Sequence, residues 1–333
     1  MGDRREFLKT AAAGAALLSS TGTLETLGMA ATPEHGAHAG KSKVVVARDS
    51  ALHGSDGELD DKRVSALLDR AIASYTGIDK PVEAWKRIVP VGKVIGLKVN
   101  GLGGKGIATH AVLTRAICER LQQAGVKPGQ IVIFEQRTRF LEACGFQHTD
   151  NPGSIRMLSS EIYGYEPQPS SHGSATIRLA KALSLCDMVI GLPILKDHSM
   201  AGVTFAMKNM YGVVDRPQDL HATGCSPAVA DLNCIPAIRD KVRFTIGDAM
   251  TSVYDGGPGF HPERLWQPNA LIVGEDRVAV DHTAWQMLEK KRAEVGMPSL
   301  EAVGRPPRYI PIAADAAHRL GTNDPQRIHL MEV

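Results

Sequence analysis

The chain has 333 residues, of which 43% are hydrophobic and 22% are charged, and its formal net charge at pH 7 is +2. This length is sufficient for one large α/β domain or for two closely packed ones. The near balance of acidic and basic residues and the 5% content of aromatic residues argue against a nucleic-acid-binding protein and against a polybasic membrane-binding surface.

The first predicted element is an export signal. Residues 4–9 read R-R-E-F-L-K and precede an apolar run rich in Ala and Gly, which is shorter than the ~20 residues of a membrane-spanning helix. Residues 37–39 read A-H-A, the small-x-small pattern of a cleavage site. The R-R-x-F-L-K core resembles a twin-arginine signal, although Asp3 stands where Ser or Thr is more usual. We expect residues 1–39 to be a signal peptide and linker and the rest of the chain to be periplasmic or otherwise exported; an ordinary secretory leader is the alternative.

From residue 40 onward, apolar runs alternate with helical patterns. Strands are predicted at 43–48, 94–100, 131–134, 188–192, 244–247 and 270–273, and helices at 60–75, 109–124, 178–185, 203–213, 227–240 and 280–295. Continuous apolar strands separated by helices indicate an α/β fold with a largely parallel sheet flanked by helices on both faces. The stretch 137–172 is rich in Pro, Ser and Gly and predicts irregular inserted loops. We expect residues 40–333 to form a single α/β domain.

Polar residues stand at the carboxyl ends of four predicted strands. In open α/β sheets, ligands bind at this edge, so these side chains are expected to meet on one rim. The alternative is that they mark the points where buried strands reach water. The residues concerned are Lys98 and Asn100, Glu135, Lys196 and His198, and Asp248.

Two glycine-rich loops lie close to these strand ends in the sequence. Gly103 and Gly104 belong to a cluster between a strand and a helix, where backbone N–H groups can hold a phosphate or carboxylate. The cluster matches neither a P-loop nor a G-x-G-x-x-G motif, and a flexible turn is the alternative. Gly257 lies in the second loop, D-G-G-P-G, where glycine lets the main chain approach a ligand closely.

The segment 196–209, K-D-H-S-M-A-G-V-T-F-A-M-K-N, is the richest in chemistry. Lys196 and Lys208 are expected to neutralise an anionic ligand, and Asp248 joins them as a candidate catalytic residue. His198 is a candidate general acid or base, or a metal ligand together with Glu135. Nearby methionines also allow a soft-metal site, with burial in a helix core as the alternative. On a helix beginning near residue 203, Thr204 and Lys208 would face the same ligand.

Two further features leave alternatives open, and the cysteine spacing argues against two kinds of site. Asp281 is expected to cap the last long helix rather than to take part in chemistry. Cys225 and Cys234 either close a small disulfide loop or are free thiols. None of the five cysteines forms a C-x-x-C pair, which argues against a ferredoxin-like cluster and a zinc ribbon.

Several of these motifs together resemble the domain-of-unknown-function 362 family. They are K-V-N, C-D-M-V-I-G-L-P-I-L-K-D-H, G-V-T-F-A-M-K-N-M-Y-G-V-V, G-D-A, D-G-G-P-G and V-A-V-D-H. The resemblance runs from about residue 43 to the last long helix and is most specific in the central segment. Carried over position by position, it implies site roles for Lys98, Asn100, Asp187, Pro193, Lys196, His198, Lys208, Asn209, Gly212, Asp248, Gly257, Pro258 and Asp281.

The resemblance also shapes the expected function. Many relatives carry ferredoxin-like cysteine motifs and are described as redox proteins, whereas this chain lacks such a motif, so an iron-sulfur cluster of its own is not expected. We expect an exported enzyme or redox-system accessory that depends on a metal ion or a small anionic cofactor. The alternative is a non-catalytic protein that binds and delivers a metal or cofactor. The expected partners are a small anionic ligand and a redox protein, with no nucleic acid and no membrane span after signal removal.

Overall fold

The structure is a computed structural model that describes residues 40–54 and 56–333, all of which lie in one compact unit. The signal peptide predicted for residues 1–39 lies outside the described residues. Among the helices that the structure describes, none combines the length and the apolar character needed to cross a membrane.

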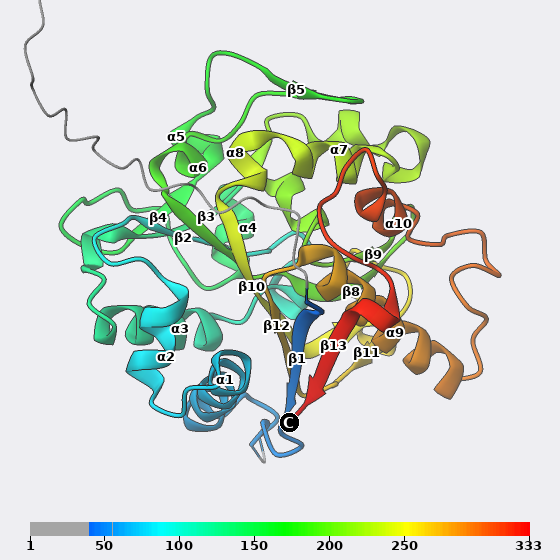
Figure 1. The fold of residues 1–333 in the computed structure, drawn as a ribbon, viewed down its shortest axis with the longest axis horizontal. Coiled ribbons are helices and arrows are strands. Elements are labelled where there is room, and N and C mark those ends of the chain that lie inside the picture. Colours follow the sequence, from blue (N-terminus) through cyan, green and yellow to red (C-terminus); the bar gives the residue numbers. More distant parts are fainter. Residues whose placement is uncertain (1–39, 55) are drawn as a thin grey trace, which may run out of the picture. The chain divides into compact units, whose positions relative to one another are not determined.

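An 11-stranded mixed sheet forms the centre of the fold (Figure 1). Its strands follow the order β13 (Ile328–Glu332), β1 (Ser42–Arg48), β12 (Ala270–Gly274), β10 (Val242–Val253), β7 (Met188–Gly191), β2 (Ile95–Lys98), β3 (Ile131–Glu135) and β4 (Arg156–Ser159). The run from β10 to β4 is parallel, while β12 is antiparallel to both of its neighbours. The predicted fold class, an α/β protein with a largely parallel sheet, is confirmed.

Two short strands pair with the long strand β10, a third extends one of them, and one hairpin is separate. β8 (Ile194–His198) runs parallel to β10 and pairs antiparallel with β9 (Gly202–Thr204), and β11 (Leu265–Trp266) pairs with the distal end of β10. The hairpin joins β5 (Ser170–His172) to β6 (Ala175–Ile177). β8 pairs with the second half of β10. The sheet therefore continues past the ends of β7 and β2, at the edge where the predicted site residues lie.

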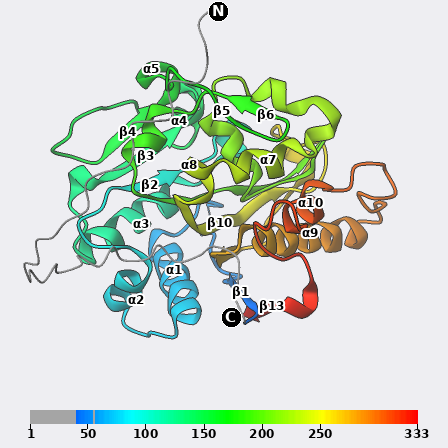
Figure 2. The ribbon, with the colours of Figure 1, turned by 45° about the horizontal axis from the view of Figure 1, so that its top comes forward.

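Helices cover both faces of the sheet (Figure 2). On one face, α1 (Asp61–Thr76), α2 (Pro81–Ile88) and α3 (Ala111–Gln123) pack on alternate strand residues such as Ile95 and Ile133. The other face carries α6 (Lys181–Leu185), α7 (Ala228–Cys234), α8 (Pro236–Arg239), α9 (Arg277–Glu294) and α10 (Tyr309–Ala314). Shorter helices are α4 (Thr138–Ala143), α5 (Ser160–Tyr163), and the 3-10 helices η1 (Lys105–Ile107), η2 (Pro128–Gln130), η3 (Lys208–Val213), η4 (Pro217–Cys225), η5 (Pro262–Arg264) and η6 (Pro325–Arg327).

Local sequence signals explain the best predicted helix. The Asp60 side chain accepts hydrogen bonds from the backbone N–H groups of Lys62 and Arg63 and so caps the start of α1. Gly77 ends the helix with a φ of 72°, a conformation that glycine adopts without steric cost. The apolar face predicted for this helix is buried throughout: Val64, Leu67, Leu68, Ala71 and Ile72.

The helix predicted for residues 203–213 is wrong. Residues 202–204 instead form β9, because Gly202, with a φ of 76°, turns the chain back and the β-branched Val203 and Thr204 pair with β8. Only the 3-10 helix η3 follows. The helix predicted for 227–240 is split into α7 and α8 at Pro236, which has no N–H group to continue the first helix.

The structure resolves one of the open alternatives. All five cysteines are buried and free, including Cys225 and Cys234, so the small disulfide loop is not formed. Met207 and Met210 are fully buried in the apolar core, and the soft-metal site stays a prediction. Met200 is 44% exposed and lies outside that core.

Candidate functional site

The sheet brings the predicted polar residues together at its carboxyl edge. Lys98 ends β2, Glu135 ends β3, and Lys196 is the central residue of the short strand β8. The first two are directly bonded to each other, and Lys196 lies within electrostatic range of both. We call the group formed by Lys98, Asn100, Glu135, Lys196, Lys208 and Asn209 the lysine rim; each member is at most 7% exposed.

Lys98 is fully satisfied as an ammonium group. Its Nζ donates to Glu135 Oε2 at 2.8 Å, to the Val99 carbonyl at 2.6 Å and to Asn209 Oδ1 at 3.4 Å. The second carboxylate oxygen of Glu135 accepts a 2.7 Å hydrogen bond from the Gln136 backbone N–H. A buried ion pair is stable when its remaining hydrogen-bonding groups are also satisfied, and this pair meets that condition.

Two asparagines link the lysines. Asn209 donates to the Lys98 carbonyl at 3.0 Å and accepts from Asn100 Nδ2 at 3.1 Å. Asn100 in turn accepts from Lys196 Nζ at 2.9 Å through its Oδ1. Thr109 fixes the backbone here, since its hydroxyl accepts from the Asn100 N–H and donates to the Leu192 carbonyl at 2.6 Å. The residue at the N-cap position of α3 is His110, whose side chain makes no capping hydrogen bond.

Lys196 has only neutral partners among the residues that the structure describes. Besides Asn100 Oδ1, its Nζ reaches the Ile107 carbonyl at 3.5 Å. Burial lowers the pKa of Lys196 to about 8. Thr204 lies directly opposite on β9, and its buried hydroxyl has no hydrogen-bond partner among the described residues. Paired residues of an antiparallel ladder project to the same face, so this hydroxyl is on the side of Lys196.

Lys208 begins η3 and is also buried without a carboxylate partner in the described part of the chain. Its Nζ lies 3.5 Å from His221 Nε2 and 3.6 Å from the centroid of the Tyr211 ring, close to the Cys225 thiol. His221 Nδ1 is 2.8 Å from the Pro217 carbonyl, which only accepts, so Nε2 is the acceptor for Lys208. Burial lowers the pKa of Lys208 to about 8.

His198 is held as a neutral imidazole. Its Nδ1 accepts hydrogen bonds from the backbone N–H groups of Met200 and Ala201, both at 3.1 Å, and its ring stacks on His221 with centroids 5.9 Å apart. Burial, reinforced by the charge of Lys208, lowers the pKa of His198 to about 2. Nε2 therefore carries the proton and is the atom available to a ligand.

The metal role suggested for His198 and Glu135 stays a prediction. In the described residues, no group of three or more His, Cys, Asp or Glu side chains is arranged to hold a metal ion. Glu135 is already bonded to Lys98, and His198 Nδ1 is engaged by backbone N–H groups. The chemistry present at the rim is that of hydrogen-bond donors, which favours anions over cations.

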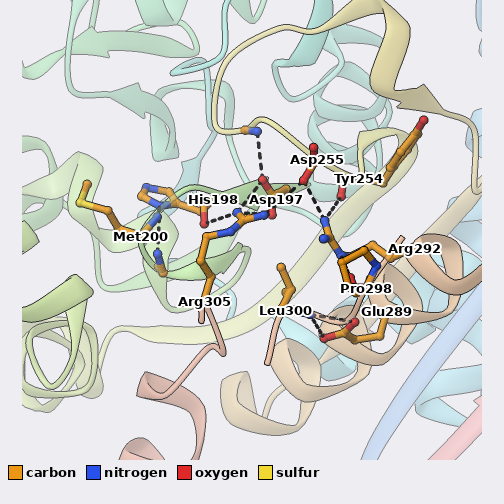
Figure 3. A network of polar contacts seen from close by, with 12 residues as sticks. Asp197, His198, Met200, Tyr254, Asp255, Glu289, Arg292, Pro298, Leu300 and Arg305 are labelled. Carbon is orange, nitrogen blue, oxygen red and sulfur yellow. Dashed lines mark hydrogen bonds and ion pairs between the residues drawn. The ribbon is translucent and has the colours of Figure 1, made fainter. Parts of the chain in front are cut away.

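Behind the rim, a charge network anchors β8 from its opposite side (Figure 3). Arg305 Nη1 lies 2.9 and 3.0 Å from the two carboxylate oxygens of Asp197, and its Nη2 lies 3.2 Å from Asp255. Arg292 reaches the same Asp255 oxygen at 2.9 Å. Burial raises the pKa of Asp197, while the charge of Arg305 opposes this shift. Since neighbouring strand residues alternate in direction, the network turns Asp197 away and leaves Lys196 and His198 on the rim side.

In the two predicted glycine loops, Gly103 and Gly257 lie too close to other residues to carry a side chain. A Cβ on Gly103 would lie 2.1 Å from Ile107 Cγ2, and one on Gly257 would lie 2.0 Å from the Asp197 carbonyl. Gly257 also donates its N–H to Asp197 Oδ2 at 3.1 Å. Gly104 has a φ of 84° with open space beside it. The first two glycines therefore allow close packing of the loops around β8, and the anion-binding role of Gly103, Gly104 and Gly257 stays a prediction.

Asp248 lies within β10 and not, as was predicted, at the end of a strand, and its partner His110 was not predicted. The buried Asp248 carboxylate accepts hydrogen bonds from His110 Nδ1 at 2.7 Å and from the His110 backbone N–H at 2.9 Å. Its other oxygen accepts from the Met250 N–H. The position of His110 in the sequence could have identified it as a candidate site residue. It follows a strand and a glycine loop at the start of a helix, which is the ligand-binding edge of an α/β sheet.

Asp281 is not a helix cap, so that expectation is wrong. The cap of α9 is Asp276, five residues earlier, whose side chain accepts from the N–H groups of Val278 and Ala279. Asp281 is fully buried in the second turn and accepts from the N–H groups of Ala206 and Met207. It therefore holds the start of η3, which carries Lys208 and Asn209.

Comparison with known proteins adds the following similarities. The chain is 24% identical over 265 residues to the Thylakoid-associated protein sll1697 of Synechocystis sp., covering 74% of this chain and 79% of that protein. A Thermotoga maritima protein of known crystal structure superimposes with a TM-score of 0.43 at 12% identity, covering 72% of this chain and 60% of its own. The lactate racemase apoprotein of Thermoanaerobacterium thermosaccharolyticum gives a TM-score of 0.38 at 10% identity, covering 70% and 54%. The chain thus spans less than two thirds of each of these solved structures.

The family match covers the part of the chain that builds the site. Residues 95–286 match the family described as Domain of unknown function (DUF362). This range includes every residue of the lysine rim, the pair of His110 and Asp248, and Asp281. Since the match extends over more than half of the sequence, the chain belongs to the DUF362 family.

Proposed function

We propose that this protein binds a small anionic ligand at the lysine rim and acts on it as a cofactor-dependent enzyme or as an accessory of a redox system. One observation carries the proposal: Lys196 and Lys208 are buried and, within the described residues, have only neutral partners. Burying an ammonium group without a counter-charge is costly, and a bound anion removes that cost.

Lys98 differs from Lys196 and Lys208 in having a carboxylate partner, and this difference supports the proposal. Lys98 already has Glu135 as its counter-charge, so the rim as a whole carries more positive than negative groups. The charges of Lys98 and Lys208 each lower the pKa of Lys196, so both ammonium groups lie within electrostatic range of Lys196. An anion between Lys196 and Lys208 would raise the pKa of both lysines and order the carboxyl edge of the sheet.

The proposal is tested by calorimetric titration with sodium sulfate and sodium phosphate. We expect wild-type protein to bind at least one of these anions, and Lys196→Met and Lys208→Met to weaken binding at least tenfold. Lys62→Met, a change of an exposed lysine on α1, is the control and should bind like the wild type. Equal affinities in all four proteins, or no binding by the wild type, would contradict the proposal.

Mass spectrometry of protein purified from its native compartment identifies the natural ligand. We expect a small anion that is present in the wild type and absent from Lys196→Met. Conversion of that compound by the purified protein would establish an enzyme. Binding without conversion would favour the alternative of a delivery protein.

We also propose that the protein is exported in folded form by the twin-arginine route. The support is the R-R-E-F-L-K sequence at residues 4–9 and the A-H-A pattern at 37–39. A ligand that is available only in the cytoplasm would then be bound before export.

A further inference from the structure

His110 and Asp248 form a hydrogen-bonded pair at the same edge of the sheet, separate from the lysine rim. The imidazole Nδ1 lies 2.7 Å from Asp248 Oδ2, and the same oxygen accepts the His110 backbone N–H at 2.9 Å. A carboxylate accepts only, so Nδ1 is the protonated nitrogen and Nε2 holds a lone pair in the neutral ring. Asp248 is itself fully buried and cannot rotate freely, because Met250 N–H binds its other oxygen at 3.1 Å.

The second ring nitrogen is available. The His110 side chain is 26% exposed, and its Nε2 has no hydrogen-bond partner among residues 40–54 and 56–333. His110 also precedes α3, a helix of 13 residues, so the positive end of the helix dipole lies beside the ring. An anion is therefore attracted to this position by the helix as well as by the lysines.

Two connections place the pair next to the lysine rim. Thr109, the residue before His110, is bonded to Asn100, and Asn100 accepts from Lys196. Asp248 lies opposite Ile194 on β8, two residues before Lys196. The charges of Asp248, Lys98 and Lys196 all act on the buried Cys144 thiol, which is consistent with this placement.

We propose that His110 is the proton-transfer residue of this site and that its Nε2 exchanges a proton with the anion held by Lys196 and Lys208. This inference rests on the proposed anion-binding function. The step is a simple proton transfer: the ligand gives a proton to the Nε2 lone pair, or takes one from Nε2–H of the imidazolium. The Nδ1–H bond to Asp248 persists throughout, so the carboxylate orients the ring and stabilises its charged form.

The charges around the ring favour this role. Burial disfavours the charged ring, but the Asp248 carboxylate outweighs burial and raises the pKa of His110; Glu58, from the loop before α1, acts in the same direction. His198 is poorly suited to the task, because its lowered pKa keeps it neutral and its Nδ1 is already engaged. Of His110 and His198, only His110 combines a buried carboxylate partner with a free nitrogen.

Proton linkage in calorimetry tests whether His110 faces the bound anion. Sulfate is the probe because it stays a dianion across the working range, so any proton taken up on binding goes to the protein. Titrations in buffers of different ionisation heat, from pH 6.5 to 9, give the number of protons taken up. We expect uptake with a component that is lost in His110→Gln and shifted to lower pH in Asp248→Asn. His329→Gln, an exposed histidine on β13, is the control and should leave the uptake unchanged.

The outcomes separate this inference from the proposed function. Sulfate binding that depends on Lys196, with the same proton uptake in His110→Gln as in the wild type, would overturn the role of His110 and leave anion binding intact. No sulfate binding by the wild type would overturn both. If His110→Gln fails to fold, NMR titration of His110 in the wild type replaces it: sulfate should raise the pKa of this ring, and an unchanged pKa would overturn the inference.

Discussion

Three buried lysines share one site, yet their surroundings give them different energetic roles. Lys98 has a carboxylate at 2.8 Å and two further acceptors, whereas Lys196 has an amide oxygen and a carbonyl oxygen. Removing one partner of a buried ion pair leaves an uncompensated charge, while removing a charge that has no counter-charge relieves its cost of burial. The two lysines should therefore respond in opposite ways to the same substitution.

Methionine keeps most of the length of the lysine side chain and removes the charge, so it is the matched test. We expect Lys98→Met to lower the free energy of unfolding by about 3–5 kcal/mol, because Glu135 is left buried and unpaired. Lys196→Met should be as stable as the wild type or up to about 3 kcal/mol more stable at pH 7, since burial already lowers the pKa of this lysine to about 8. Urea unfolding measures both values. A destabilised Lys196→Met with a normal Lys98→Met would reverse the assignment of the two roles.

Gly212 is required by the lysine rim rather than by a turn. A Cβ at this position would lie 2.5 Å from Lys98 Nζ and 2.9 Å from Glu135 Oε1. We expect Gly212→Ala to displace the ion pair and to cost about 1–3 kcal/mol of stability, as overpacking of a core does. Gly153→Ala is the control, because its added Cβ would meet only Asn151 Oδ1 at 3.4 Å. Urea unfolding of both variants checks this, and equal stabilities would show that the rim adjusts without strain.

At the scale of elements, α9 positions η3 through one buried carboxylate. Asp281 accepts from the N–H groups of Ala206 and Met207 at 2.6 and 3.1 Å, directly before the segment that carries Lys208. Burial raises the pKa of Asp281 to about 7, against the lowering effect of these two bonds. In the unfolded chain an aspartate titrates near 4. Between about pH 4 and pH 7 the folded protein thus binds more protons than the unfolded chain, so this residue makes stability fall as pH rises.

This pH dependence should disappear in Asp281→Asn. We expect the wild type to lose a few kcal/mol relative to the variant between pH 4.5 and pH 7.5, since one unit of pKa corresponds to about 1.4 kcal/mol. The measurement is urea unfolding of both proteins across this range, with the difference between them removing the contribution of other groups. Parallel curves would show that Asp281 is ionised in the folded protein throughout.

Elements that are stabilised by local contacts can be predicted from the sequence, whereas elements that are stabilised by distant contacts cannot. The helix at 60–75 was predicted well because its cap, its apolar face and its terminal glycine are all local signals. The segment 203–213 was not, because β9 exists only through pairing with β8, and η3 is held by Asp281 from 75 residues away. Sequence periodicity contains no information on such distant partners, so tertiary contacts overrode the local helical pattern.

At the scale of the whole molecule, the topology of the sheet accounts for what was foreseen in the site. Lys98, Glu135 and Lys196 were expected to meet because each stands at or just past the carboxyl end of a predicted strand, and the structure places them together. The pairing of His110 with Asp248 spans 138 residues and joins β10 to the residue before α3. The ends of β2 and β3 could be predicted from apolar runs, whereas β8, the true end of β10 and the pairing of His110 with Asp248 could not.

The state of the cysteines links the whole fold to the proposed route of export. All five thiols are buried and free, although disulfides form readily in an oxidising compartment. Folding before export would shield them, which a folded-protein route allows. We expect the exported protein to have five thiols that react with a thiol reagent only after denaturation.

The double variant Arg4→Lys, Arg5→Lys tests the route itself. Because the twin-arginine pair is read by a receptor, conservative replacement should leave the uncleaved precursor in the cytoplasm, whereas Arg63→Lys, an exposed change on α1, should not affect export. Cell fractionation measures the distribution, and N-terminal sequencing of the exported wild type should begin at Gly40. Normal export of the double variant, with disulfides in the mature protein, would instead indicate an ordinary secretory leader and folding after translocation.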